Sequence, residues 1–145
     1  MFKSILVPLD GSEYSERSLA TAFELARMTG AKIAMLTVVW GYKDVHVHST
    51  ELLEKQALER AEAYLAPFLR DAGEAGFDVT GQVAHGIPSE EIVKAADEAN
   101  TNLIVMSTHG IGASGRHALG SVAARVLEDS HCPVLMLRIP EAGPR

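Results

Sequence analysis

The segment at residues 107–121 carries the densest group of residues that could bind a phosphate. Its glycines supply backbone that can turn sharply, approach a ligand closely and direct several N–H groups at one anion: Gly110, Gly112, Gly115 and Gly120. Ser121 stands at the expected start of a helix, where unpaired amides and the positive end of the dipole favour negative charge. Arg116 adds a planar guanidinium suited to an outer phosphate, although an exposed loop arginine is more often only solvated. The segment therefore predicts a small phosphate-bearing ligand.

Two regular elements flank this glycine-rich segment and would position it. Residues 103–106 form an unbroken apolar run, which is typical of a parallel strand buried on both faces. After the segment, apolar residues recur at i, i+3, i+4, i+7 and i+8, which marks one face of a helix: Leu119, Val122, Ala123, Val126 and Leu127. The candidate phosphate site is thus a loop between a buried strand and a helix.

Strand and helix patterns alternate along the whole chain. The expected strands cover residues 5–8, 33–39, 77–84, 103–107 and 133–139, and the expected helices begin near residues 12, 50, 87 and 121. Such alternation implies parallel strands joined by right-handed crossovers. We therefore expect one Rossmann-like α/β domain over residues 1–145, with an open five-stranded parallel sheet of order 3-2-1-4-5 and four helices on both faces.

Particular residues are expected to begin, end or bend these helices. Ser12 offers an N-cap oxygen to the first helix, and Gly30 suits its end. Ser89 or its neighbour is expected to cap the third helix, whose first turn holds two carboxylates. Pro67 lies inside the second helical pattern and should kink that helix or end its regular part.

The expected sheet brings two distant segments to one place. In an open parallel sheet, ligands bind beyond the carboxyl ends of the strands, where the strand order reverses. The order 3-2-1-4-5 puts this reversal between the first and fourth strands, so Pro8, Leu9 and Asp10 should lie beside residues 107–121. The Asp10 carboxylate could accept from a ribose hydroxyl or approach a phosphate-bound cation. The Asp-Gly-Ser sequence equally suits a turn or a helix cap, and both alternatives stay open.

Composition limits the classes of function. The 145-residue chain is 47% hydrophobic and 22% charged, which is ordinary globular usage for one domain. Its formal net charge of -6 argues against nucleic acid as the main partner, because phosphate neutralisation needs clustered Lys and Arg. The single cysteine, Cys132, excludes an internal disulfide framework and is expected to fill the core. The sequence has no long apolar segment, so no membrane partner is predicted and we expect a cytoplasmic protein.

The histidines do not indicate an enzyme. His109 and His117 belong to the glycine-rich segment, but no partnered base or nucleophile pattern accompanies them, so no catalytic residue is predicted. His46 and His48 form H-x-H in a polar segment without the further ligand pair that zinc requires. A solvated loop is the favoured interpretation there, and no protein metal ligand is predicted.

Known phosphate motifs fit poorly, but a family resemblance fits well. Gly110-x-Gly112-x-x-Gly115 matches the dinucleotide spacing too late in the chain, and no Walker A sequence is present. The chain closely resembles the universal stress protein family at ILVPLDGS (residues 5–12), MSTHG (106–110), Arg116, LGSVA (119–123) and CPVL (132–135). The family signature G-x2-G-x9-G-[ST] reads here Ser107-x2-Gly110-x9-Gly120-Ser121, with serine in place of the first glycine.

The resemblance implies the nucleotide-binding group of that family, with ATP or a related adenine nucleotide as ligand, Mg²⁺ on its phosphates and a second copy of the chain as partner. It assigns ligand contacts to strand ends and to the glycine loop: Pro8, Leu9 and Asp10 at the adenosine end, Val38 at the adenine, Met106 and Ser107 near the ribose, and Gly110, Gly120, Ser121 and Val122 around the phosphates. Serine at 107 is small enough to be accommodated, and its hydroxyl could bond the ligand. Family members pair the last strand, here residues 133–139, across a two-fold axis.

Three functions remain as hypotheses from the sequence. The leading one is a stress-response sensor or regulator that binds an adenine nucleotide without turning it over. The second is a nucleotide-free dimeric interaction module, in which the glycine loop is only a tight connection. The third is a slow ATP hydrolase in the same crevice, for which the sequence names no base.

Overall fold

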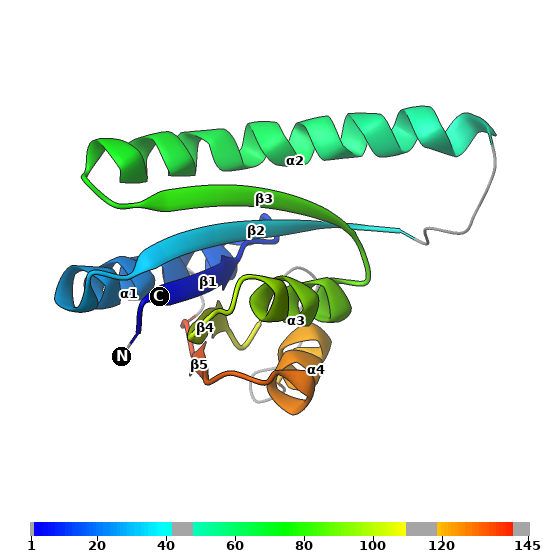
Figure 1. Cartoon of the computed structure of the whole chain (residues 1–145). Helices are drawn as coiled ribbons and strands as arrows, with labels where there is room; N and C mark the ends of the chain where they lie inside the picture. Colours follow the sequence, from blue (N-terminus) through cyan, green and yellow to red (C-terminus); the bar gives the residue numbers. More distant parts are fainter. Residues whose placement is uncertain (1, 42–47, 110–118, 141–145) are drawn as a thin grey trace.

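Strands and helices alternate as the sequence predicts. The computed structural model describes residues 2–41, 48–109 and 119–140. The elements in this part of the chain are β1 (Ser4–Pro8), α1 (Glu13–Thr29), β2 (Lys32–Trp40), α2 (His48–Glu74), β3 (Val79–Gly86), α3 (Pro88–Glu98), β4 (Leu103–Ser107), α4 (Ser121–Asp129) and β5 (Val134–Leu137) (Figure 1). The strands form one sheet of order β3-β2-β1-β4-β5 in which every pairing is parallel, so the predicted topology is confirmed.

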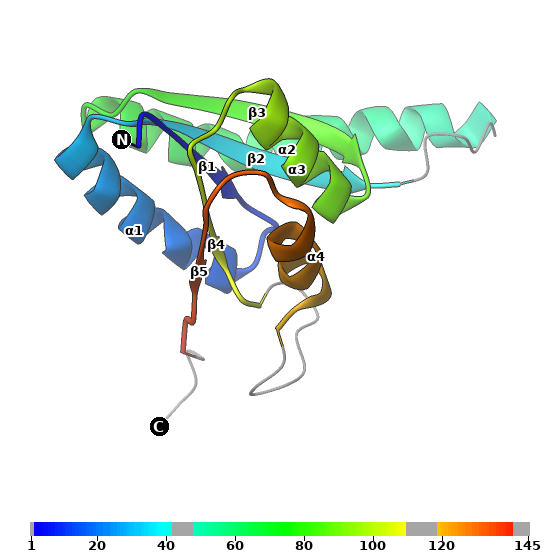
Figure 2. The same cartoon turned by 60° about the horizontal axis from the view of Figure 1, so that its bottom comes forward.

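The helices cover both faces of the sheet. Leu19 of α1 and Leu65 of α2 pack in one buried cluster with Ile5 of β1. On the other face, Ile92 of α3 and Val126 of α4 pack with residues of β1, β2 and β4. Figures 1 and 2 show the two helix layers with the sheet between them. Because β1 and β4 contribute side chains to both clusters, they read as unbroken apolar runs in the sequence.

Proline ends the ladder between the two central strands. β1 pairs with β2 from Ser4 to Pro8, but it pairs with β4 only at Ile5 and Leu6. The Ser4 carbonyl accepts from the amide of Asn102, which directly precedes β4, whereas the Leu9 amide donates to the Leu36 carbonyl of β2. Backbone groups alternate in direction along a strand, so the nitrogen of Pro8 lies on the β4 side and has no hydrogen to donate. The pairing of β1 with β4 therefore stops where the strand order reverses.

The expected ends of α1 are confirmed. The Ser12 hydroxyl accepts from the Ser15 amide at 3.1 Å, which caps the first turn. Gly30 closes the helix in the left-handed conformation, with φ of 75°, and its amide donates to the Ala26 carbonyl. These two caps fix where the chain leaves β1 and where it enters β2.

One expectation about the helices was wrong, and one of the two alternatives at Pro67 is excluded. Ser89 does not cap α3, because the N-cap is Ile87, without a side-chain cap, and Pro88 takes the first helical position. Proline suits that position since its missing N–H would be unpaired there anyway. Pro67 does not end the regular part of α2, which continues to Glu74. Both Pro67 and Ala63, four residues earlier, are exposed, so water can serve the carbonyl that proline leaves without a donor.

Two strand boundaries also differ from the expected ones. Residue Phe77 precedes β3 and packs its ring on Phe23, with the centroids 4.7 Å apart. Strand β3 begins at Val79 and continues to Gly86, two residues beyond the expected end. β5 is shorter than residues 133–139, because its pairing with β4 covers only Val134–Leu137. As predicted, β5 lies at one edge of the sheet.

Candidate functional site

The turns that follow β1 and β4 meet at the point where the strand order reverses. β1 is the neighbour of both β2 and β4 in the sheet. Tyr14, in the first turn of α1, has its ring centroid 6.0 Å from that of His109, which follows β4. The two rings belong to segments far apart in the chain, and Figure 2 shows the ends of these strands close to the start of α4. The structure thus brings together the two segments that the sequence analysis had placed side by side.

Two of the residues that the resemblance assigns to the base and ribose share a cluster with Val122, which it assigns to the phosphates. Val38 of β2, Met106 of β4 and Val122 of α4 belong to the hydrophobic cluster on the face covered by α3 and α4. Met106 is buried, while Val38 and Val122 are only partly buried. Three elements therefore present apolar surface, still partly accessible, at the carboxyl end of the sheet.

Leu9 and Ser107 point to the opposite face. Leu9 is 1% exposed in the cluster beneath α1 and α2, and its amide already donates to the Leu36 carbonyl at 2.8 Å. Ser107 follows the alternation of β4 onto the same face as Val105, and its hydroxyl donates to the His109 carbonyl. A ligand on the α3 and α4 face could reach these two residues only through their main chains. The serine side chain at 107 is accommodated by bonding its own loop.

The Asp10 turn has a defined conformation. One Asp10 carboxylate oxygen accepts from the Ser12 amide at 2.9 Å, and the Asp10 amide donates to the Ser15 hydroxyl at 3.2 Å. Gly11 has φ of 86°, a left-handed conformation that favours glycine. Asp10 therefore stabilises the turn, as one of the two alternatives from the sequence expected. A carboxylate has several lone pairs, so the exposed Asp10 can also accept from a ligand.

The start of α4 is arranged for an anion. Gly120 occupies the N-cap position, so no side chain caps the first turn within the described part of the chain, and Ser121 is exposed as the first helical residue. The Gly120 amide donates to the Thr108 carbonyl at 2.8 Å, and a Cβ at Gly120 would lie 3.0 Å from that oxygen. The remaining amides of the first turn stand at the positive end of the helix dipole. This geometry suits a phosphate.

Some predicted residues lie outside the described part of the chain, and others were missed. Gly110, Arg116 and His117 fall in residues 110–118, and His46 falls in 42–47, so the structure describes none of them. Sequence reasoning missed Tyr14 and Thr108, which contact His109: the Thr108 hydroxyl lies 3.1 Å from its Nδ1. Tyr14 lies two residues after Ser12 and Thr108 directly follows Ser107, and this closeness to predicted positions is the one sequence signal that could have indicated them.

The described residues hold neither a metal cluster nor a membrane-spanning helix. Over ranges 2–41, 48–109 and 119–140 there is no group of three or more His, Cys, Asp or Glu side chains that could hold a metal ion. In the same ranges no helix has both the length and the apolar character needed to cross a membrane.

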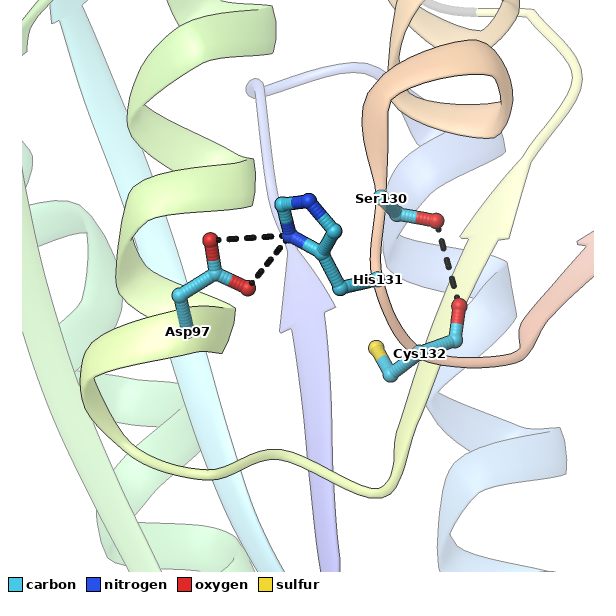
Figure 3. Close-up of polar contacts among 4 residues, drawn as sticks. All are labelled: Asp97, Ser130, His131 and Cys132. Atoms are coloured by element: carbon cyan, nitrogen blue, oxygen red, sulfur yellow. Dashed lines mark hydrogen bonds and ion pairs between the residues drawn. The ribbon is translucent and has the colours of Figure 1, made fainter.

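A second polar cluster lies at the opposite, amino end of the strands (Figure 3). Nδ1 of His131, just before β5, is 3.1 Å from both carboxylate oxygens of Asp97 on α3, and both side chains are largely exposed. Burial raises the pKa of the neighbouring Cys132 thiol, and the charge of Asp97 raises it further. A thiol held in its neutral form is a poor nucleophile, which agrees with a packing role for Cys132 against the α3 and α4 face.

Comparison with known proteins gives a consistent result. The family model described as "Universal stress protein family" matches residues 1–138. Universal stress protein MJ0531 of Methanocaldococcus jannaschii is 33% identical, over 97% of this chain and 85% of that protein. A universal stress protein of Thermus aquaticus is 37% identical, over 95% of this chain and all of that protein.

Solved structures share the fold over nearly the whole chain. The structure of hypothetical protein MJ0577 superposes with a TM-score of 0.86 at 29% identity, covering 98% of this chain and 99% of that one. A universal stress protein solved in complex with cAMP superposes with a TM-score of 0.73 at 25% identity, covering 94% and 97%. With a family model that matches almost end to end and relatives above 30% identity, the chain belongs to the universal stress protein family.

Proposed function

We propose that this protein binds an adenine nucleotide, with ATP as the leading candidate, at the carboxyl end of the sheet. It acts as a stress-response regulator through this binding. The observation that carries the proposal is the meeting of the Asp10 turn, the Gly120–Thr108 contact and the start of α4 at one end of the sheet. The relative solved with cAMP supports an adenine nucleotide as ligand. The proposal keeps the cytoplasmic location expected from the sequence.

Each part of the site has a role in this proposal. Val38 and Met106 offer apolar surface to the base and sugar, and Pro8 at the end of β1 keeps the adenosine role that the resemblance implies. Val122 lies in the first turn of α4, on the side of the phosphates. The first-turn amides of α4 and the Ser121 hydroxyl donate to phosphate oxygens. Gly110 and Arg116 keep the phosphate roles that the family resemblance implies.

The residues present also fit a magnesium ion carried on the phosphates. The Asp10 carboxylate is exposed and supplies oxygen, the ligand type that Mg²⁺ prefers. When bound, the ion would neutralise phosphate charge next to a chain of net charge -6. Asp10 would then hold the ligand through the ion or through a ribose hydroxyl.

Direct measurement of the ligand tests the proposal. Mass spectrometry of heat-denatured protein is expected to show co-purified adenine nucleotide. Isothermal titration of nucleotide-free protein is expected to show saturable binding of ATP at one site per chain. In Asp10→Asn the ATP affinity should fall on the order of tenfold. Absence of saturable binding of ATP, ADP and AMP at millimolar concentration would contradict nucleotide binding. Steady release of phosphate, lost in Asp10→Asn, would instead favour the hydrolase.

A second copy of the chain is the proposed partner of β5. Within the described residues, nothing pairs with the outer edge of β5, whose four residues are all partly buried. The carbonyls of Pro133 and Leu137 accept from the amides of Ile104 and Thr108, so the alternate residues Val134 and Met136 direct their backbone groups outward. An unpaired apolar edge of this kind favours pairing with a copy of itself.

Met136→Pro is expected to convert the dimer to a monomer. Proline removes an outward-facing N–H while leaving the carbonyls that pair with β4 in place. Light scattering of the eluted protein would measure the mass, with Met136→Leu as the control that keeps the amide. A Met136→Pro protein that remains folded and dimeric would show that the interface lies elsewhere.

A further inference from the structure

Tyr64 lies on the face of the sheet covered by α1 and α2, and its hydroxyl contacts the start of α1, next to the candidate site. It is half-buried on α2, and its ring packs edge-on against Phe68, with the centroids 5.4 Å apart. Its hydroxyl donates to Oε2 of Glu16 at 2.8 Å. Glu16 is in the first turn of α1, directly after the Asp10 turn. This hydrogen bond therefore ties the middle of α2 to the start of α1.

The surroundings of the phenol extend to the Asp10 turn itself. Burial raises the pKa of Tyr64 above its usual range, the hydrogen bond and charge of Glu16 raise it further, and the Asp10 charge adds to the effect. The Gly11 backbone acts in the opposite direction and lowers it. The hydroxyl is thus bonded to Glu16 and sensitive to the charge of Asp10. It stays neutral, and so remains the hydrogen-bond donor to Glu16.

The turn beside it depends on short-range contacts. Asp10 is held by the Ser12 amide and the Ser15 hydroxyl, and Gly11 is in the left-handed conformation. These bonds lie within the turn and the first turn of α1, and the Leu9 amide, bonded to the Leu36 carbonyl, ties the residue before the turn to β2. Tyr64 supplies a contact from a different helix, which packs on β2 and β3 through the same cluster.

We propose that Tyr64 is a positioning residue for the nucleotide site: by holding the Glu16 carboxylate at the start of α1, its hydroxyl fixes the Asp10–Ser12 turn so that the Asp10 carboxylate faces the ligand. The proposal rests on the proposed function. Tyr64 lies beneath the face opposite to the apolar cluster of Val38 and Met106, so it acts without touching the nucleotide. Phenylalanine would keep the packing but leave Glu16 without its donor, next to Asp10.

A double-mutant cycle on nucleotide affinity tests this role. Tyr64→Phe is expected to weaken ATP binding by roughly three- to tenfold, since a lost hydrogen bond of this kind corresponds to about that factor. In the double variant with Asp10→Asn, the affinity is expected to match that of Asp10→Asn alone, because Tyr64 acts through that carboxylate. Phe68→Leu is the control: it disturbs the same ring packing without removing the hydroxyl, and should leave the affinity near that of the unmodified protein.

The outcomes separate this inference from the proposed function. Unchanged affinity in Tyr64→Phe, or losses that simply multiply in the double variant, would overturn the positioning role while ATP binding by the unmodified protein still stands. If the unmodified protein binds no adenine nucleotide, both fall.

Stability at high pH gives a readout of the Tyr64 environment that needs no nucleotide. A pKa raised in the folded state means that the stabilisation is fully present below the unfolded pKa, near 10, and is lost as the pH rises above it. Urea unfolding is expected to show a steeper loss of stability above pH 10 for the unmodified protein than for Tyr64→Phe. Parallel curves for the two proteins would contradict the burial of the phenol and its contact with Glu16.

Discussion

Replacing Gly120 with valine is expected to lower ATP affinity by at least about tenfold, the largest effect on binding that we expect from a single residue of the site. A Cβ at this position would lie 3.0 Å from the Thr108 carbonyl oxygen, which is backbone and cannot rotate away. The Gly120 amide donates to the same oxygen. A larger side chain must therefore push the start of α4 away from the loop after β4, and the first-turn amides move with it.

Gly73→Val is the matched control for this variant. It adds the same side chain inside α2, where a Cβ at Gly73 would have nothing within 4 Å. Gly120→Ala should give a smaller loss than valine, because its single methyl needs a shift of only a few tenths of an ångström. Titration calorimetry measures affinity, and circular dichroism checks the fold. A folded Gly120→Val protein with unchanged affinity would favour the nucleotide-free interaction module, in which this glycine is only part of a connection.

The fold was predictable because its signals are local and repeated. Each apolar run of four or five residues, such as Ile104 and its neighbours, is too short for a helix and reads as a buried strand. Ser12 and Gly30 mark the ends of α1 by chemistry that needs no tertiary context. The expectations failed where context decides: Pro67 is tolerated inside α2 because the freed carbonyl faces water, and Phe77 leaves the strand to stack on Phe23.

The candidate site was predictable only as a meeting of segments. The strand order places Asp10 beside the loop after β4, but it does not say which way each side chain points. Leu9 and Ser107 share the α1 and α2 face, which follows from the alternation of strands once the register is known. The Tyr64–Glu16 hydrogen bond joins residues 48 positions apart on two helices, and no spacing in the sequence indicates it.

Ile104→Ala is expected to destabilise the protein by about 2–5 kcal/mol, a large part of the total stability of about 5–15 kcal/mol that a domain of this kind has. Ile104 of β4 is 0% exposed, lies opposite Leu6 of β1, and packs beneath α3 and α4. Truncation leaves a cavity that the surrounding strands cannot close, because the Ile104 amide is also bonded to the Pro133 carbonyl, just before β5. Urea unfolding monitored by circular dichroism measures the loss.

The same experiment separates the core from the site. Leu127→Ala removes an equally large apolar side chain from α4, but Leu127 is 52% exposed, so its loss should cost less than about 1 kcal/mol. Ile104 faces the helices three residues before the strand end, so the folded fraction of Ile104→Ala should still bind ATP, and saturating ATP should restore part of the lost stability by mass action. Equal destabilisation by the two variants would mean that β4 is not the centre of the core. If ATP fails to stabilise a folded Ile104→Ala protein, the packing beneath β4 is part of the binding site. The loss of the Ile104 side chain would then also disturb Met106 and Val122, which belong to the same cluster.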